Sequence, residues 1–180
     1  NSAWCSTLVL GKSYKIKFDE IKIKLEKKNL PVRNFFFPLD SIKNWNRAYG
    51  KKGFYQYQFV VPMNYGEEVI NDVITIINSY NQKPVLGVLK TFGNIDSIGL
   101  LSFPTEGVTL AIDFPNKGEA TLKMLEDIDS VIIDAGGRIY PAKDARMKKE
   151  TFLKSFLNFN EFEKYIDPLF SSSFLRRMSI

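Results

Sequence analysis

The chain has 180 residues and a mass of 20.7 kDa, which suits one well-packed domain and is short for two. Its composition is 44% hydrophobic, 14% aromatic and 25% charged, which excludes a disordered tail, a collagen-like repeat and a coiled coil. Histidine is absent and Cys5 is the single cysteine, so a Ser-His-Asp triad, a Cys-His dyad, a disulfide framework and a zinc site lack their residues, and we expect no metal site. No apolar run is long enough to span a bilayer and residues 1–20 lack a signal-peptide core, so we expect a cytoplasmic protein.

The positive charge is concentrated in the first part of the chain. The net charge is +5 and the isoelectric point about 9.2, and residues 1–52 hold 12 Lys and Arg against 4 Asp and Glu. Such a segment could meet nucleic acid, acidic headgroups or a phosphorylated substrate. Between residues 14 and 25, however, lysines alternate with apolar residues, as in half-buried strands whose lysines point outward. We favour this second interpretation and expect no nucleic-acid partner, because no recognised nucleic-acid module accompanies the charge.

Hydrophobic periodicity predicts the elements in chain order. Alternation over residues 4–25 predicts one or two strands, and residues 44–50 predict a turn or short helix. Residues 54–61 predict a strand with one aromatic face and one face that carries Gln56 and Gln58. The following predicted elements are a helix over about 66–81, strands over 85–92 and 108–114, a helix that ends before residues 136–137, and an extended segment over 138–140.

The order β-α-β-β-α-β over residues 54–140 predicts an α+β fold of the ferredoxin-like type, with two helices packed on one face of an antiparallel sheet. The helix starts have capping-box spacing, with Asn64 before Glu67 and Asn116 before Glu119. The glycines at 136–137 follow a helix instead of opening one, so they predict a helix C-cap and not a phosphate cradle.

After residue 143 the pattern changes to short helical pieces, over about 148–157 and 160–166. We expect its phenylalanines to be exposed: Phe152, Phe156, Phe159, Phe162, Phe170 and Phe174. They would either cover an open side of the sheet or dock on something absent from the chain. We therefore divide the chain into residues 1–140 and a C-terminal segment, residues 141–180.

Several polar residues interrupt otherwise apolar elements. Gln56 and Gln58 share a strand face and must either find partners or line a wet cavity. Lys90 and Asp113 lie within apolar strands, and alternation predicts that each points to solvent. Residues 140–146 combine a phenol with three charges, which is typical of an anion- or sugar-binding loop and equally of a salt-bridged turn.

Six segments together resemble a known family of enzymes. They are residues 36–40, 44–50, 53–62, 89–93, 112–115 and 136–146. Their order and sequence are similar to the C-terminal half of vanillyl-alcohol-oxidase-type flavoproteins, the FAD-linked oxidoreductases that include the sugar-lactone oxidases. The resemblance implies that residues 1–140 form a substrate-binding (cap) domain. It also implies that residues 141–180 return to an N-terminal FAD-binding domain, from the same gene or a separate chain, that this sequence does not contain.

The resemblance implies oxidation of a hydroxyl of a sugar or lipid-linked sugar phosphate to a ketone, by hydride transfer to N5 of FAD. The chain alone would be inactive. An epimerising reductase fits this chemistry as a further partner, and a polyprenyl-phosphate-sugar substrate would bring the protein to the periphery of the inner membrane.

The resemblance also assigns site residues. Lys143 would act on the substrate beside the flavin ring, and Tyr140, Lys143 and Arg146 would contact the cofactor. The substrate pocket would contain Gln56, Gln58, Lys90, Thr109 and Ala111. Thr109 and Ala111 stand where related enzymes carry asparagine and cysteine, so this chain departs from them at the sugar.

Two other interpretations stay open. The chain could be a free-standing binding module that lacks redox chemistry, or an RNA-binding ferredoxin-like domain that uses its basic first third. The second is disfavoured because the aromatic motifs of such RNA-binding domains are absent.

Overall fold

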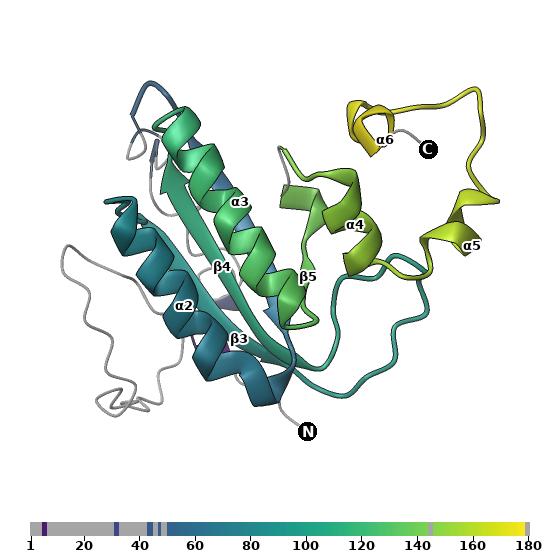
Figure 1. The fold of residues 1–180 in the computed structure, drawn as a ribbon, viewed down its shortest axis with the longest axis horizontal. Coiled ribbons are helices and arrows are strands. Elements are labelled where there is room, and N and C mark those ends of the chain that lie inside the picture. Colours follow the sequence, from purple (N-terminus) through teal and green to yellow (C-terminus); the bar gives the residue numbers. More distant parts are fainter. Residues whose placement is uncertain are drawn as a thin grey trace.

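The computed structural model describes residues 5–6, 31–32, 43–44, 47, 50–143 and 146–178. Its centre is a five-stranded antiparallel sheet in the order β1-β3-β4-β2-β5 (Figure 1). The strands are β1 Cys5–Ser6, β2 Phe54–Val61, β3 Leu86–Phe92, β4 Gly107–Pro115 and β5 Arg138–Ile139. The order of β3, β4, β2 and β5 is that of a ferredoxin-like sheet, so the predicted α+β class is confirmed.

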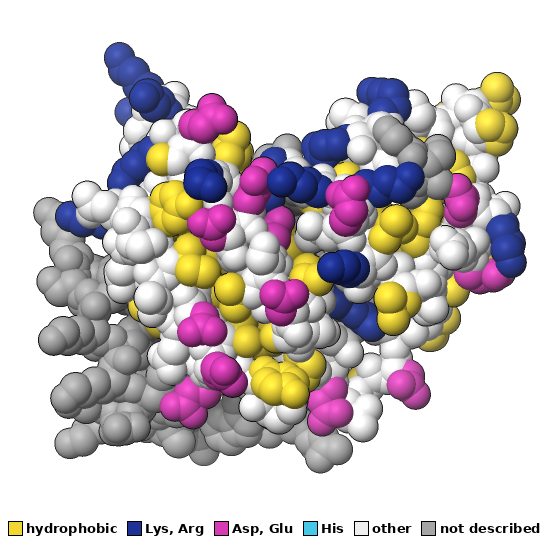
Figure 2. Space-filling model, in the orientation of Figure 1, with side chains coloured by type: hydrophobic (Ala, Val, Ile, Leu, Met, Phe, Trp, Pro, Cys, Tyr) yellow, Lys and Arg dark blue, Asp and Glu magenta, His cyan; other side chains and the backbone are white. Residues whose placement is uncertain are grey.

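Two long helices, α2 Gly66–Ser79 and α3 Glu119–Asp134, lie side by side across one face of the sheet (Figure 1). Apolar residues at helical spacing make this packing possible, since each helix turns one stripe toward the strands. The largest side chains buried there include Phe59, Phe114, Met124, Ile128 and Ile132. Acidic side chains are scattered over the outer surface of both helices in Figure 2. The helix-covered face is therefore the core, with a solvated, acidic exterior.

Strand register divides the sheet residues between two faces. Tyr57 pairs with Ile112 on the helix-covered face, whereas Gln58 pairs with Ala111 on the opposite face, because neighbouring residues of a strand alternate. We call this opposite side the second face. Thr109 there pairs with Lys90 of β3 and with Val60 of β2. The prediction that one face of β2 is core and the other carries amides is confirmed.

The helix ends differ in part from the predicted caps. A 3-10 turn, η4 Met63–Tyr65, precedes α2. The N-cap of α2 is Tyr65, which makes no side-chain cap hydrogen bond, so the predicted capping box of Asn64 and Glu67 is wrong. The second box is also wrong, since the N-cap of α3 is Gly118. Asn116 does accept a hydrogen bond from the Gly118 amide at 2.9 Å, in an Asx turn just before the helix.

The predicted C-cap of α3 is confirmed. Gly136 has a φ of +71°, a left-handed conformation that glycine adopts without steric cost. Its amide donates to the Ile133 carbonyl, and the Gly137 amide donates to the Ile132 carbonyl at 2.8 Å. This pair of bonds is the Schellman arrangement, which ends a helix and redirects the chain. Here it directs the chain into β5.

The C-terminal segment contains the 3-10 turn η5 Pro141–Lys143 and the short helices α4 Lys149–Ser155, α5 Phe159–Glu163 and α6 Ser173–Met178. The expectation of exposed phenylalanines is wrong for Phe152, Phe156 and Phe159, which are 2 to 3% exposed. Their rings pack on one another at centroid distances of 5.2 and 5.3 Å and join the main core. Helical spacing alone could not show this, because Phe152 and Phe156 belong to α4 and its C-cap whereas Phe159 belongs to α5, and burial depends on how these helices pack.

Gly107 begins β4 where two backbones approach closely. A Cβ atom at this position would lie 2.1 Å from the carbonyl oxygen of Val61. Gly107→Ala is therefore expected to destabilise the protein by about 1–3 kcal/mol, since a neighbouring backbone has to move. Gly93→Ala is the matched control, because nothing lies within 4 Å of its Cβ position. Urea denaturation would measure both, and equal midpoints for the two variants would contradict the expectation.

Part of the predicted N-terminal structure lies outside the described residues. Of the strands expected over residues 4–25, β1 is described, and it pairs with β3 through Cys5 and Lys90. Residues 43–44 form part of a turn, as expected for the region 44–50. Segment 36–40 of the resemblance lies outside the described range.

Candidate functional site

The second face of the sheet carries the predicted substrate residues on three adjacent strands. Gln56 and Gln58 come from β2, Thr109 and Ala111 from β4, and Lys90 from β3. Register places all five on the same side, since the paired positions of antiparallel strands share a face. The structure therefore brings together residues that are up to 55 positions apart in the sequence.

One side-chain hydrogen bond orders the middle of this face. The Gln58 amide donates through Nε2 to Thr109 Oγ1 at 3.1 Å, and Thr109 is 1% exposed. The interpretation that the glutamines find partners is thus confirmed for Gln58, whereas Gln56 is exposed. The bond holds the Gln58 side chain toward Thr109, since both polar groups gain a hydrogen-bond partner.

Three charged groups lie together at this face. Asp113 is 5% exposed, so the prediction that it points to solvent is wrong, whereas Lys90 is exposed as predicted. Partial burial holds the pKa of the Lys143 ammonium below its ordinary value; the nearby Asp113 carboxylate opposes this shift and the Lys90 charge adds to it. Lys143 comes from η5 and thus joins the sheet residues at the site.

Tyr140 lies at the boundary between the sheet and the C-terminal segment. Its amide donates to the Gln58 carbonyl at 2.8 Å, which continues the pairing of β5 with β2 by one residue. Its ring stacks on Phe103 at a centroid distance of 4.6 Å, and Phe103 in turn meets the edge of Phe92. Sequence analysis missed Phe103 because it lies in a glycine- and proline-rich loop with no periodic pattern.

Arg146 lines a small cavity with Gln56, Gln58, Tyr140 and Lys143, but its guanidinium is engaged with the helix-covered side of the sheet. Its guanidinium forms two hydrogen bonds of 2.8 Å with the carboxylate of Asp129, which belongs to α3 on the helix-covered face. The salt-bridged turn considered for residues 140–146 is therefore present at Arg146. The predicted contact of Arg146 with a cofactor stays a prediction.

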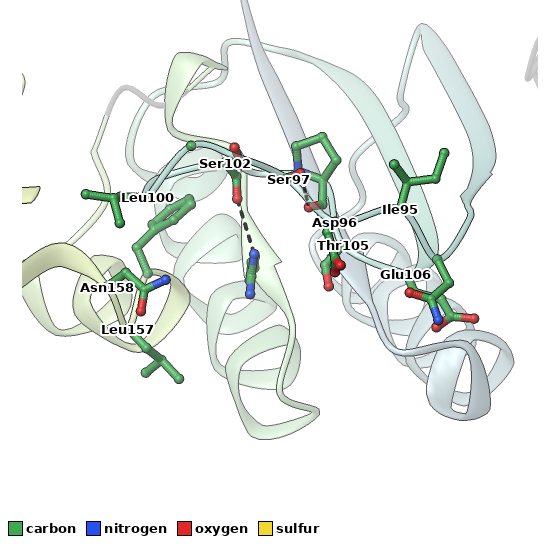
Figure 3. Close-up of a pocket in the computed structure, with 14 residues that line it drawn as sticks. Ile95, Asp96, Ser97, Leu100, Ser102, Thr105, Glu106, Leu157 and Asn158 are labelled. Atoms are coloured by element: carbon green, nitrogen blue, oxygen red, sulfur yellow. Dashed lines mark hydrogen bonds between the residues drawn. The ribbon is translucent and has the colours of Figure 1, made fainter. Parts of the chain in front are cut away.

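A polar cavity of about 400 Å³ adjoins the site on the other side of the Phe103 loop. Figure 3 shows it between the segment that carries Ile95 to Glu106 and the segment that carries Leu157 and Asn158. The Arg138 guanidinium donates to the Ser102 carbonyl at 3.2 Å, and both residues line the cavity. Ser102 and Pro104, the neighbours of Phe103, line this cavity. The loop that contains Phe103 therefore borders the cavity and also stacks its phenyl ring on Tyr140.

Two features are absent from the described residues. Within these ranges, no group of three or more Cys, Asp or Glu residues is placed to hold a metal ion. None of the helices in the described part of the chain combines the length and the apolar character that a membrane span requires.

Comparison with known proteins supports the resemblance. No protein-family model matches the chain. The chain is 37% identical over 154 residues, 83% of its length, to decaprenylphosphoryl-β-D-ribose oxidase of Mycolicibacterium smegmatis, and it spans 33% of that protein. It is 32% identical over 99 residues, 52% of its length, to an uncharacterized protein of Streptomyces coelicolor, of which it spans 27%. The chain thus spans about a quarter to a third of these relatives, and over most of its own length it resembles decaprenylphosphoryl-β-D-ribose oxidase, as its sequence motifs predict.

Proposed function

We propose that this chain is the substrate-binding part of a FAD-dependent oxidoreductase, which oxidises a hydroxyl of a sugar or lipid-linked sugar phosphate to a ketone. The similar protein is by name an oxidase of a polyprenyl-phosphate-linked ribose. The observation that carries the proposal is the second face, where the charges of Asp113 and Lys90 act on Lys143 and Gln58 lies on the same side of the sheet. Amides suit sugar hydroxyls, and ammonium groups suit a phosphate.

The charge distribution supports the second face as the substrate side. The exterior of α2 and α3 carries scattered carboxylates, which repel an anionic substrate (Figure 2). Lys90 lies on the second face, across the sheet from this surface, and its charge acts on Lys143. A negatively charged sugar phosphate would therefore be attracted by the lysines of the predicted site and repelled by the carboxylates of the helices.

The residues of the site fit one end of the cofactor. Tyr140 offers an aromatic ring held by stacking, and Lys143 offers a partly buried cation, which suit the edge of an isoalloxazine ring and a substrate beside it. A dinucleotide also needs a glycine-rich loop that opens a helix, and neither α2 nor α3 begins with one. We propose that this chain contacts the ring while another domain holds the rest of the FAD, which when bound accepts the hydride.

Each side chain has a distinct task in this proposal. Gln58, fixed by Thr109, presents its amide to the sugar hydroxyls. Lys90, exposed on β3, pairs with the phosphate. Lys143 stands at the hydroxyl to be oxidised, and its lowered pKa brings its proton exchange nearer to neutral pH, which suits a group that takes the hydroxyl proton.

The exposed apolar residues of the C-terminal segment support docking on a flavin-binding domain. Tyr165, Leu169 and Phe170 are 73, 88 and 75% exposed. Exposed apolar residues that lie this close together commonly mark an interaction site. In the proposal this is where residues 141–180 return to the flavin domain, although Phe152 and its neighbours belong to the core of this chain.

The proposed function is tested on the native polypeptide that contains this sequence, purified from its source. A polypeptide heavier than 20.7 kDa with bound flavin is expected. Anaerobic addition of a polyprenyl-phosphate pentose should bleach the absorbance of oxidised flavin, whereas free FAD with the same compound should stay oxidised. A flavin-free 20.7 kDa species, or a flavin that no sugar phosphate reduces, would favour the free-standing binding module.

A further inference from the structure

A buried cluster of three side chains lies directly behind the turn that carries Lys143. The Tyr57 hydroxyl donates to Asp129 Oδ1 at 2.7 Å, and Arg146 donates through Nη1 and Nη2 to both carboxylate oxygens at 2.8 Å. The side chains of Arg146 and Asp129 are 12 and 8% exposed, and Tyr57 is 5% exposed. We call these three residues the Asp129 cluster. It connects β2, α3 and the end of the 140–146 loop at one point.

The geometry of the cluster is specific to its residue types. A guanidinium presents two parallel N–H groups that match both oxygens of a carboxylate, whereas an ammonium cannot form both bonds in this plane. Two charges removed from water also need these hydrogen bonds to offset their lost hydration. Arg146 is therefore confined to one position and orientation, and the backbone at residue 146 is confined with it.

The other end of the same loop is confined independently. Tyr140 is hydrogen-bonded to the Gln58 carbonyl, and the Lys143 amide donates to the Tyr140 carbonyl at 3.3 Å within η5. Lys143 thus lies between two fixed residues, Tyr140 and Arg146. The cavity that Lys143 and Arg146 line together with β2 holds only about 10 Å³, which is about the room for a single water molecule. This side of the turn is therefore closely packed against β2 and the Arg146 side chain.

We propose that Arg146 is a positioning residue: its ion pair with Asp129, completed by Tyr57, fixes the η5 turn so that Lys143 is held on the second face beside Asp113. This inference rests on the proposed function where it concerns turnover. It gives Arg146 a different task from the cofactor contact that the family resemblance implies, because its guanidinium is already engaged on the helix-covered side of the sheet.

A second ion pair provides a matched control. Lys148 Nζ lies 3.2 Å from Glu126 Oε2, which also joins α3 to the residues just before α4, but these side chains are 60 and 43% exposed. Exposed pairs of this kind contribute little to structure. Glu126→Gln removes this ion pair and leaves the Asp129 cluster intact, so it controls for a general change of charge on α3.

The test measures the titration of Lys143 and turnover in the native polypeptide. Competitive acetylation with acetic anhydride at a series of pH values, read for each lysine by mass spectrometry, gives the titration midpoint of Lys143 without any substrate. Among the described residues, the charged groups that act on the pKa of Lys143 are Asp113 of β4 and Lys90 of β3. Because these stay in place, a rise of the midpoint toward that of an ordinary lysine reports that the Lys143 side chain has left its partly buried position.

Asp129→Asn and Arg146→Lys are expected to raise the midpoint of Lys143 and to lower kcat roughly 10²-fold, the usual consequence of a misplaced reacting group. Tyr57→Phe removes one hydroxyl and is expected to act in the same direction with a smaller effect. Glu126→Gln should change neither quantity. If Asp129→Asn does not fold, the two milder variants carry the test.

The two proposals fail separately. An unchanged Lys143 midpoint in folded Arg146→Lys and Tyr57→Phe would overturn the positioning role, whatever turnover shows. A midpoint that rises as expected, in a protein whose flavin no sugar phosphate reduces, would support the positioning of Lys143 and overturn the proposed function.

Discussion

Replacing Lys143 by methionine is expected to lower the turnover of the native enzyme by about 10²–10⁴-fold, the usual contribution of a group that transfers a proton in the reaction. Methionine keeps the length of the apolar side chain and removes the ammonium. Anaerobic flavin reduction in a stopped-flow instrument would measure the rate. The ionisation of Lys143 should also disappear from the pH–rate profile of the variant.

The stability of Lys143→Met should not fall with its activity. Burial lowers the pKa of Lys143 in the folded protein, so folding disfavours its charged form. The resulting cost to stability is fully present below the folded-state pKa and is relieved as the pH rises toward the unfolded-state pKa. The variant should therefore be as stable as the parent or slightly more stable at neutral pH, and the difference should vanish at high pH.

Lys148→Met provides the control for this prediction. Lys148 is an exposed lysine in the same segment, and its ion pair with Glu126 is a surface contact. Its replacement should leave both turnover and the denaturation midpoint close to those of the parent. Parallel losses of stability and activity in Lys143→Met would instead assign Lys143 a structural role.

Phe152→Ala is expected to reduce the free energy of unfolding by about 3–5 kcal/mol. Phe152 is 2% exposed and meets the rings of Phe156, Phe159 and Phe174 at centroid distances of 5.2 to 5.3 Å. Removing the ring leaves a cavity among side chains that belong to separate short helices, which can close only by moving those helices. Chemical denaturation followed by circular dichroism would measure the loss.

The matched control is Phe170→Ala, in the same segment of chain. Phe170 is 75% exposed, so its truncation should change the midpoint little. Equal stability of the two variants would mean that residues 147–178 do not contribute to the core of this chain. The predicted division of the chain at residue 140 would then also separate its stable part from the C-terminal segment.

The candidate site was predictable in part. The pattern of β2 placed Gln56 and Gln58 on the face opposite the core, and strand pairing then brought Thr109 and Ala111 to that face. Their assignment as substrate residues came from the family resemblance and stays a prediction. Phe103 carried no signal in the sequence, because its importance derives from one stacking contact with Tyr140 across a loop.

Local sequence by itself determined the order of elements and the two faces of each strand. A strand alternates every two residues and a helix every 3.6, so the β-α-β-β-α-β order could be read from short windows. The helix end at Gly136 was equally local, since a left-handed residue is satisfied by bonds within one turn. The similarity to an oxidase likewise needed only the linear motifs.

Tertiary structure alone decided which polar groups are buried and with which partners. Asp129 meets Tyr57 across 72 positions and Arg146 across 17, separations that no periodic pattern encodes. The burial of Asp113 and of Phe152 likewise depends on what other elements place over them. Alternation and helical spacing define the direction of a side chain relative to its own element, whereas burial, ion pairing and pKa depend on the neighbouring elements, which only the assembled fold supplies.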